Sequence, residues 1–230
     1  MAAPRRRRRK PPAPARAVSS RSTTAAVDHR DLERALGKPH LRVIGLDDGA
    51  FTRRARRAPV VAVAMSLPDL VEGIELGWVE VDGRDATERT IALLQASPFL
   101  RGARAILVDG IALAGFNLLD LRRLSAGIGR PVLSVTRRAP EFVTIRAALR
   151  KYFPREFAAR WALVKSCRLY PVPVVGRPLW VAAAGCRRAE AAAIVRRSVG
   201  HGRWPEPLRL AHLVGHSVGA HARPPRRPNP

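Results

Sequence analysis

Short apolar segments separated by polar turns recur through the central part of the chain, and their spacing predicts an alternation of strands and helices. Apolar residues and period-two alternation predict six strands. The predicted strands are 41–46 (LRVIGL), 59–67 (PVVAVAMSL), 74–83 (IELGWVEVDG), 104–110 (RAILVDG), 131–135 (PVLSV) and 178–185 (PLWVAAAG). The first three are joined by short connections, including a turn at 68–73, and the later ones are separated by longer segments.

Helical periodicity fills the longer connections. The predicted helices are 85–97, 116–129, 141–152, 156–165, 187–199 and a last one beginning near Glu206. Asp85 is expected to cap the first of them, with Glu88 three residues later as its capping-box partner. The chain is therefore predicted to be an α/β protein.

The order of elements predicts the topology of the sheet. Three meandering strands followed by βα units indicate a mixed sheet whose first and fourth strands lie side by side and whose later strands run parallel to the first. This is the ribonuclease H-like arrangement, with helices flanking the sheet. A doubly wound fold is not expected, because it needs a crossover helix directly after the first strand.

The predicted domain occupies residues 39–220. Residues 1–38 are rich in Arg, Pro, Ala and Ser and are expected to be a disordered basic extension, with a short helix around 31–36, and residues 221–230 a disordered tail. The apolar runs are too short to span a membrane, so none is expected as a partner. Cys167 and Cys186 are far apart without a CxxC pairing and are expected to be free thiols of a cytoplasmic, prokaryotic protein.

The charge balance is strongly basic, with 42 Lys and Arg against 18 Asp and Glu and a net charge of +24. The excess of basic over acidic residues remains when the residues of both tails are left out of the count. Lys and Arg that neutralise phosphates release counterions, so a basic domain favours a nucleic-acid partner and association with the nucleoid. A general enrichment in Arg from high genomic GC content is the alternative explanation. The sequence gives no basis for predicting a protein partner.

The candidate chemistry lies where carboxylates follow strands. Asp47 and Asp48 end the first strand, Asp82 ends the third and Asp109 ends the fourth. If the first and fourth strands are parallel neighbours, Asp47 and Asp109 emerge side by side at the carboxyl edge, where ligands of open sheets bind. Close carboxylates repel unless a cation lies between them, and Mg²⁺ or Mn²⁺ takes oxygen ligands. The alternative for each Asp is an Asx turn or a cap.

Other polar residues are expected near the same edge. Arg137 and Arg138 follow the 131–135 strand and are predicted to bind a phosphate, with an ion pair to a local carboxylate as the alternative. Asn117 is a candidate for contact with a phosphate or base, although a helix cap is its more common role.

Five ordered segments resemble the endonuclease dU family, a largely archaeal group similar to endonuclease V. These segments are IGLDDGAF, VEVDGRDAT, ILVDGIALAGFNLLD, VTRRAP and PEPLRLAHL, and the resemblance covers residues 41–215. It implies a ribonuclease H-like fold and endonuclease activity on DNA that carries deaminated bases, deoxyuridine above all.

The resemblance also implies roles for individual residues. Asp47 and Asp109 match the two aspartates of the endonuclease V pattern, and Arg137 stands where that pattern has a basic residue. The C-terminal motif brings in Arg209 and His212 as nucleic-acid contacts. Endonuclease V has a glutamate between its aspartates, and the residues competing for that place here are Glu80, Asp82, Asp85 and Glu88.

Asp82 is the expected third metal ligand because it ends its strand, with Glu80 as an additional ligand on the same strand face. The chain has no counterpart of the PYIP wedge of endonuclease V, so recognition of the base is not carried over. The sequence predicts a metal-dependent endodeoxyribonuclease of DNA repair. A ribonuclease H-like protein that binds nucleic acid without cleaving it, and a nuclease acting on RNA or structured substrates, remain alternatives.

Overall fold

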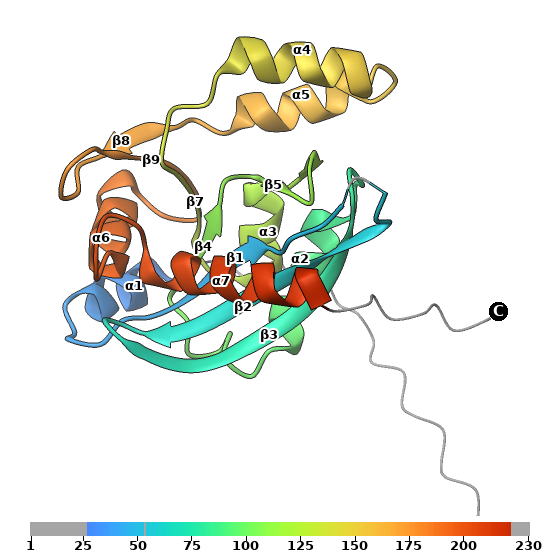
Figure 1. Ribbon diagram of the computed structural model, residues 1–230. Coiled ribbons are helices and arrows are strands. Elements are labelled where there is room, and N and C mark those ends of the chain that lie inside the picture. Colours follow the sequence, from blue (N-terminus) through green and yellow to red (C-terminus); the bar gives the residue numbers. More distant parts are fainter. Residues whose placement is uncertain (1–26, 53, 222–230) are drawn as a thin grey trace, which may run out of the picture.

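A seven-stranded mixed sheet forms the centre of the protein (Figure 1). The computed structural model describes residues 27–52 and 54–221. The strands lie in the order β3-β2-β1-β4-β7-β9-β8, and β5 and β6 form a separate small hairpin. Their bounds are β1 Arg42–Asp48, β2 Arg57–Ser66, β3 Leu70–Glu80, β4 Ala105–Asp109, β5 Ala112–Leu113, β6 Asn117–Leu118, β7 Val132–Thr136, β8 Tyr170–Val172 and β9 Leu179–Ala184.

The directions of the strands confirm the ribonuclease H-like prediction in its main point. β1, β2 and β3 form an antiparallel meander, and β1 pairs with β4 in parallel, with Leu46 opposite Val108. β7 extends the parallel part beside β4. The last strands differ from the prediction, because β9 runs antiparallel to β7 and β8 antiparallel to β9.

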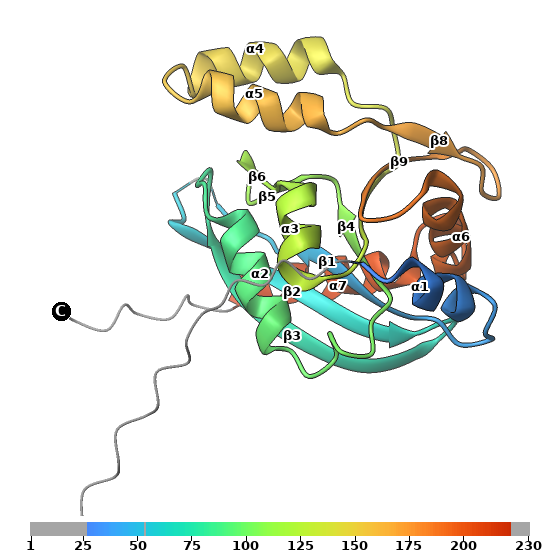
Figure 2. The same ribbon diagram turned by 180° about the vertical axis from the view of Figure 1, so that it is seen from behind.

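Helices cover both faces of the sheet (Figures 1 and 2). On one face, α2 and α3 pack over alternate residues of β1 and β4, such as Ile44 and Ile106. On the other, α1, α6 and α7 cover the residues between them, such as Val43 and Leu107. The helices are α1 His29–Leu36, α2 Ala86–Ala96, α3 Leu121–Ile128, α4 Phe142–Tyr152, α5 Phe157–Ser166, α6 Arg188–Ser198 and α7 Glu206–His221.

The α4–α5 hairpin stands apart from these layers, above the β5–β6 hairpin in Figure 1. A small apolar cluster that includes Leu118, Leu149 and Val164 lies beneath it. Arg160 of α5 is almost fully buried and donates hydrogen bonds to the backbone oxygens of Phe116 and Asp82. The hairpin is thereby tied to the two turns that border the carboxyl edge of β1 and β4.

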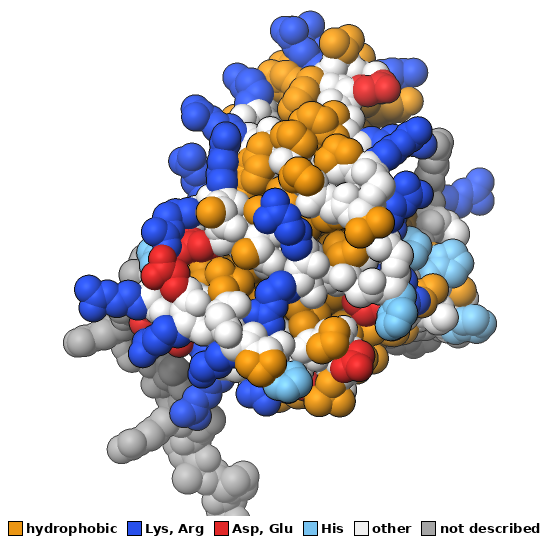
Figure 3. Space-filling view, turned by 90° about the vertical axis from the view of Figure 1, so that its left-hand side faces the viewer, with side chains coloured by type: hydrophobic (Ala, Val, Ile, Leu, Met, Phe, Trp, Pro, Cys, Tyr) orange, Lys and Arg blue, Asp and Glu red, His pale blue; other side chains and the backbone are white. Residues whose placement is uncertain are grey.

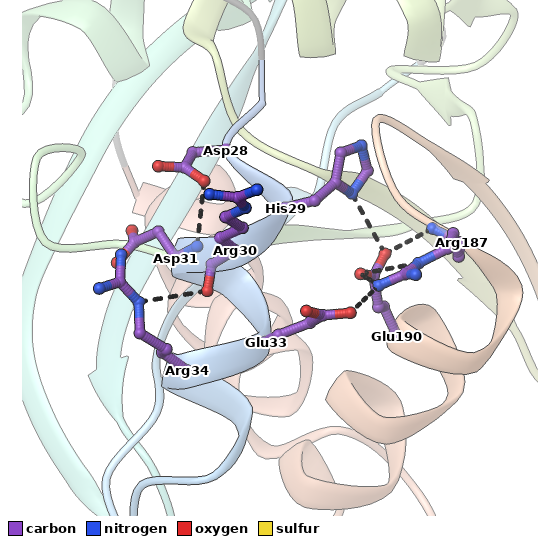
Figure 4. A network of polar contacts seen from close by, with 8 residues as sticks. All are labelled: Asp28, His29, Arg30, Asp31, Glu33, Arg34, Arg187 and Glu190. Atoms are coloured by element: carbon purple, nitrogen blue, oxygen red, sulfur yellow. Dashed lines mark hydrogen bonds and ion pairs between the residues drawn. The ribbon is translucent and has the colours of Figure 1, made fainter.

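The sequence prediction for the N-terminal segment holds only in part. The short helix expected around 31–36 is present as α1, and Leu32 and Ala35 pack into the core, so the expected disorder does not extend to residue 38. Arg187, next to α6, binds Glu33 and Glu190 and holds α1 in place (Figure 4). Residues 1–26 and 222–230, also expected to be disordered, lie outside the described residues.

Several element boundaries differ from the prediction. β3 begins at Leu70, within the expected turn, and the helix expected at 116–129 begins only at Leu121, because Asn117 belongs to β6 and Asp120 caps the helix. The predicted capping box on α2 is wrong, since the Asp85 carboxylate accepts from the backbone N–H of Glu80 instead. Both cysteines are free, as expected. In the described part of the chain, no helix has the length and apolarity needed to cross a membrane.

α7 lies directly against the backbone of β1 because glycines line the contact. A Cβ at Gly45 would stand 2.3 Å from the carbonyl carbon of Pro207, and one at Gly49 would stand 2.1 Å from the carbonyl oxygen of Gly215. Neither contact can relax by turning a side chain, since the opposing atoms are backbone. The glycines therefore set the height of α7 above the sheet.

We predict that Gly45→Ala lowers the free energy of unfolding by about 3 kcal/mol or more, because overpacking against backbone forces α7 away from β1. Urea unfolding followed by circular dichroism measures the effect. Gly200→Ala is the matched control, since a Cβ there meets nothing within 4 Å. A Gly45→Ala protein as stable as the control would contradict the packing described.

Candidate active site

Asp47 and Asp109 lie on neighbouring parallel strands at the carboxyl edge of the sheet. The register that places Leu46 opposite Val108 brings the next residues, Asp47 and Asp109, side by side. Alternation along each strand turns both toward the face covered by α7, together with Val43 and Leu107. The pairing expected from the sequence is thus formed by strand register alone.

Burial and mutual repulsion act strongly on these carboxylates. The pKa of Asp47 is raised from its ordinary 3.8 to about 7, first by burial and then by the negative charges of Asp109 and Asp48. Burial also raises the pKa of Asp109 and of Asp48, although Arg137 opposes the effect on Asp109. The three aspartates therefore form a cluster of negative charge that a cation would stabilise.

Asp48 is the member of this cluster that sequence reasoning did not select. It follows Asp47 in β1, so its side chain points to the opposite face of the sheet, where it accepts a hydrogen bond from the backbone N–H of Ala114. Ala114 lies in the β5–β6 turn and has a positive φ of 49°. The doubled Asp at the end of β1 was the available signal, but the contact with the turn was not visible in the sequence.

His212 reaches the cluster from α7. Its Nδ1 lies 2.9 Å from Oδ2 of Asp47, and the side chain is 60% exposed. This contact lowers the pKa of Asp47 and so partly opposes burial and repulsion. His212 therefore lies at the carboxyl edge of the sheet, as expected, and its observed partner is a carboxylate of the cluster.

Arg137 borders the cluster on the side of β7. Its Nη1 lies 3.8 Å from Oδ2 of Asp109, and its guanidinium stacks 3.9 Å from the ring centroid of Trp204. Arg138 follows it and is exposed. Both arginines stand at the predicted edge, and the ion pair considered as the alternative for Arg137 is present as a long contact.

Asp82 makes a different set of contacts. Its carboxylate accepts a hydrogen bond from the backbone N–H of Phe116 at 2.8 Å, and its own N–H donates to the carbonyl of Ala114. Asp82 has a positive φ of 55°. Asp82 is thus hydrogen-bonded to the β5–β6 turn. The third acid whose charge acts on the Asp47–Asp109 pair is Asp48. The side chain of Glu80 is partly exposed at the end of β3.

The structure corrects the prediction for Asn117. This residue is fully buried, and its amide oxygen accepts from the N–H of Ala86 while its amide nitrogen donates to Glu80 and Asp85. No part of it is left for a phosphate or a base. Arg209 is exposed on α7, and its guanidinium is held by the carboxylate of Glu206.

The donor set fits a hard divalent cation. Within residues 27–52 and 54–221, no three His, Cys, Asp or Glu side chains form a ready-made metal cage. Mg²⁺ does not require one, because it commonly binds through one or two carboxylates together with phosphate oxygens of the substrate. Asp47, which is buried, and Asp109, which is partly buried, both have raised pKa values and lie side by side at the sheet edge, so they suit such a cation.

The sheet order and the placement of carboxylates on β1 and β4 define a ribonuclease H-like protein, and solved structures agree. A protein of unknown function from Archaeoglobus fulgidus aligns with a TM-score of 0.70 at 30% identity, over 77% of this chain and 98% of that one. The catalytic domain of human endonuclease V aligns with a TM-score of 0.54 at 16% identity, over 83% and 87%. Ciona intestinalis endonuclease V, solved with DNA containing an inosine, aligns at 0.50 and 16%, over 75% and 83%.

The family is identified by the sequence itself. The family model described as endonuclease dU matches residues 39–219. A UPF0215 protein of Thermococcus gammatolerans is 37% identical over an alignment of 186 residues that covers 79% of this chain and 93% of that protein. The chain belongs to the endonuclease dU family.

The carboxylate cluster predicts how stability depends on pH in the absence of metal. A folded pKa raised above the ordinary value stabilises the fold at low pH, and this contribution is lost as pH rises through about 7. For Asp47 it amounts to at most about 4 kcal/mol. Between pH 5 and pH 8 in EDTA, the wild-type protein should therefore lose stability, and Asp47→Asn should lose much less.

The side chains whose charge or hydrogen bond acts on the pKa of Asp47 are Asp109, Asp48 and His212, so the comparison needs a variant that leaves all of them in place. Asp69→Asn, in the exposed turn before β3, is that control and should keep the wild-type pH dependence. Urea unfolding at the two pH values gives the result. Equal losses of stability in Asp47→Asn and the control would contradict a contribution of Asp47 to the pH dependence.

Proposed function

We propose that this protein is a divalent-metal-dependent endonuclease that hydrolyses phosphodiester bonds in DNA containing deaminated bases, and that deoxyuridine is the preferred lesion. The observation that carries the proposal is the cluster of Asp47, Asp48 and Asp109 at one sheet edge, flanked by Arg137 and His212. Helix capping and turn formation do not account for a buried pair of carboxylates on neighbouring parallel strands.

Three further observations support this proposal. The family description joins endonuclease activity to deoxyuridine. Endonuclease V, which shares the fold, has been solved with DNA that contains an inosine, itself a deaminated base. The net charge of +24 suits a polyanionic substrate. Together they favour DNA repair as the setting of the reaction.

Each residue of the cluster has a distinct part in this proposal. Asp47 and Asp109 would hold Mg²⁺ or Mn²⁺, which supplies activation of water and stabilisation of the charge on the leaving oxygen. His212 contacts Asp47 through Nδ1, and in its imidazolium form its Nε2–H would give a proton to the leaving oxygen. Arg137 places positive charge beside the phosphate, and Asp48 fixes the β5–β6 turn through Ala114.

The direct test is cleavage of labelled single- and double-stranded DNA carrying one deoxyuridine or one deoxyinosine, with Mg²⁺, Mn²⁺ or EDTA. Wild-type protein should nick near the deoxyuridine only when a metal is present. Asp109→Asn should reduce the rate by about a hundredfold or more, because even residues that only support metal ligands contribute that much. Binding of the same DNA should change little, and the unfolding midpoint should be no lower than that of the wild type, because the substitution removes a repelling charge.

Asp69→Asn serves as the control for loss of one negative charge and should cleave at the wild-type rate. Full activity of Asp109→Asn would contradict the proposed active site. Tight binding of DNA by the wild-type protein without nicking under any metal would instead assign the chain to proteins that bind nucleic acid without cleaving it. Nicking of RNA in place of DNA would change the substrate and leave the site intact.

The part played by Asp82 requires a separate comparison of isosteric variants. Asn at position 82 can still accept the N–H of Phe116 through its amide oxygen, so Asp82→Asn should retain activity within about tenfold of wild type. Asp47→Asn should lose about a hundredfold or more. Single-turnover cleavage at saturating enzyme distinguishes them. If Asp82→Asn lost as much activity as Asp47→Asn, Asp82 would be a metal ligand, as the sequence predicts.

A further inference from the structure

A basic cavity lies beside the carboxylate cluster. A cavity of about 350 Å³ is lined by Arg137, Arg138, Arg177 and Arg203, with Pro178, Leu179 and Trp204 completing the wall. These residues come from the loop after β7, from the loop before β9 together with the first residue of β9, and from the loop before α7. Because Thr136 at the end of β7 pairs with Trp180 at the start of β9, the first two loops meet at the edge that also carries Asp109.

The charge of this cavity is almost uncompensated. No Asp or Glu lines it, and the nearest carboxylate contact is the 3.8 Å approach of Arg137 to Asp109. Among the described residues, Arg138, Arg177 and Arg203 have no acidic partner within ion-pair distance. Lys and Arg also outnumber acidic side chains on the side of the molecule that carries the β8–β9 loop (Figure 3). Four like charges with only one long ion pair among them favour binding of an anion.

Local contacts hold parts of the cavity in place before any ligand arrives. The guanidinium of Arg137 stacks on Trp204, which is only 7% exposed. The hydroxyl of Thr136 donates to the carbonyl of Arg138 and orders the loop after β7. The side chain of Arg203 lies over Gly176, where a Cβ would stand 2.7 Å from its Cδ. These side chains and loops would therefore lose little conformational entropy when a ligand binds in the cavity.

The lining favours a phosphate over a base. Arginine forks match the oxygens of a phosphate and bind it with two hydrogen bonds at a time. A flipped base would need an aromatic face to stack on, but the aromatic residue of this cavity is buried and its ring is covered by Arg137. Pro178 and Leu179 add no hydrogen-bonding side chain.

We propose that the cavity lined by Arg137, Arg138, Arg177 and Arg203 binds a phosphate group of the nucleic-acid strand whose neighbouring phosphodiester lies at Asp47 and Asp109. The inference rests on the proposed function for the identity of the strand. Neighbouring strands of a sheet lie about 5 Å apart, so β7 and β9 place the cavity within reach of a nearby phosphate on the same strand. Arg137 touches both sites and sets the spacing between them.

The test uses Arg177→Gln and Arg203→Gln, two exposed positions outside the catalytic cluster. Binding of a labelled deoxyuridine oligonucleotide is measured in EDTA over a series of salt concentrations, so that no cleavage contributes. Each substitution should weaken binding about tenfold at 0.1 M salt and lower the slope of log K against log salt by about one, as expected for the loss of one phosphate contact.

Arg101→Gln is the matched control, because this exposed arginine lies before β4, at the opposite edge of the sheet. It changes the net charge equally and should leave the slope unchanged. If Arg177→Gln and Arg203→Gln alter affinity and slope no more than Arg101→Gln, the phosphate site is refuted. A wild-type protein that shows the predicted binding but never cleaves would refute the nuclease proposal and leave the phosphate site standing.

Two sources can supply the phosphate, and a second pair of oligonucleotides distinguishes them. Short strands with and without a 5′-phosphate are compared for wild type and the two variants. An internal phosphodiester predicts equal losses on both strands. A terminal phosphate predicts that the variants lose only the extra affinity of the phosphorylated strand. Inorganic phosphate should compete with either strand for wild-type protein, and absence of any competition would contradict the site.

Discussion

The repulsion between buried carboxylates at the ends of β1 and β4 is the constraint around which the structure is arranged. Parallel pairing fixes Asp47 beside Asp109, and the burial of Asp47 and partial burial of Asp109 limit screening by solvent. The pKa of Asp47 rises to about 7 as a result. A protein tolerates such a site at a cost in stability, and strongly perturbed carboxylates at a sheet edge are typical of functional sites.

The surroundings of the cluster supply opposing charge from two sides. α7 approaches β1 through Gly45 and Gly49 closely enough for His212 to meet Asp47. Arg137 follows β7 and lies near Asp109. Its guanidinium stacks on the ring of Trp204, which lies just before α7. The same stacking makes Arg137 one wall of the basic cavity. Substrate phosphate, metal and carboxylates would therefore share one edge of the sheet.

The sequence was sufficient where the local pattern and topology agreed. Asp47 and Asp109 were predictable because each follows a buried strand, and the strand order required those two strands to be neighbours. The parallel core followed from the order of the elements, whereas the short α1 helix was expected only as part of a disordered extension. Prediction was weaker for β9, because its direction depends on the end of β7 at which the chain re-enters the sheet, and no local residue decides that.

Side-chain roles that depend on tertiary contacts could not be predicted. The sequence pattern favours a place for Asn117 at a helix start near the substrate, but its amide is used entirely to join β6 to α2 and to the end of β3. The hydrogen bond from the N–H of Phe116 to the Asp82 carboxylate was likewise not visible in the sequence, and its place as a metal ligand stays a prediction. Arg177 and Arg203 stand in loops without a motif, and only the fold brings them to Arg137.

The most direct test of the central claim is a titration of Mn²⁺, followed by electron paramagnetic resonance, into wild-type protein and Asp47→Asn with and without an uncleavable phosphorothioate oligonucleotide. Mn²⁺ suits a carboxylate site and is observable where Mg²⁺ is not. We expect binding to the wild type that tightens when the oligonucleotide is present and is lost in Asp47→Asn. Binding that is the same in both proteins would contradict a metal site at Asp47 and Asp109.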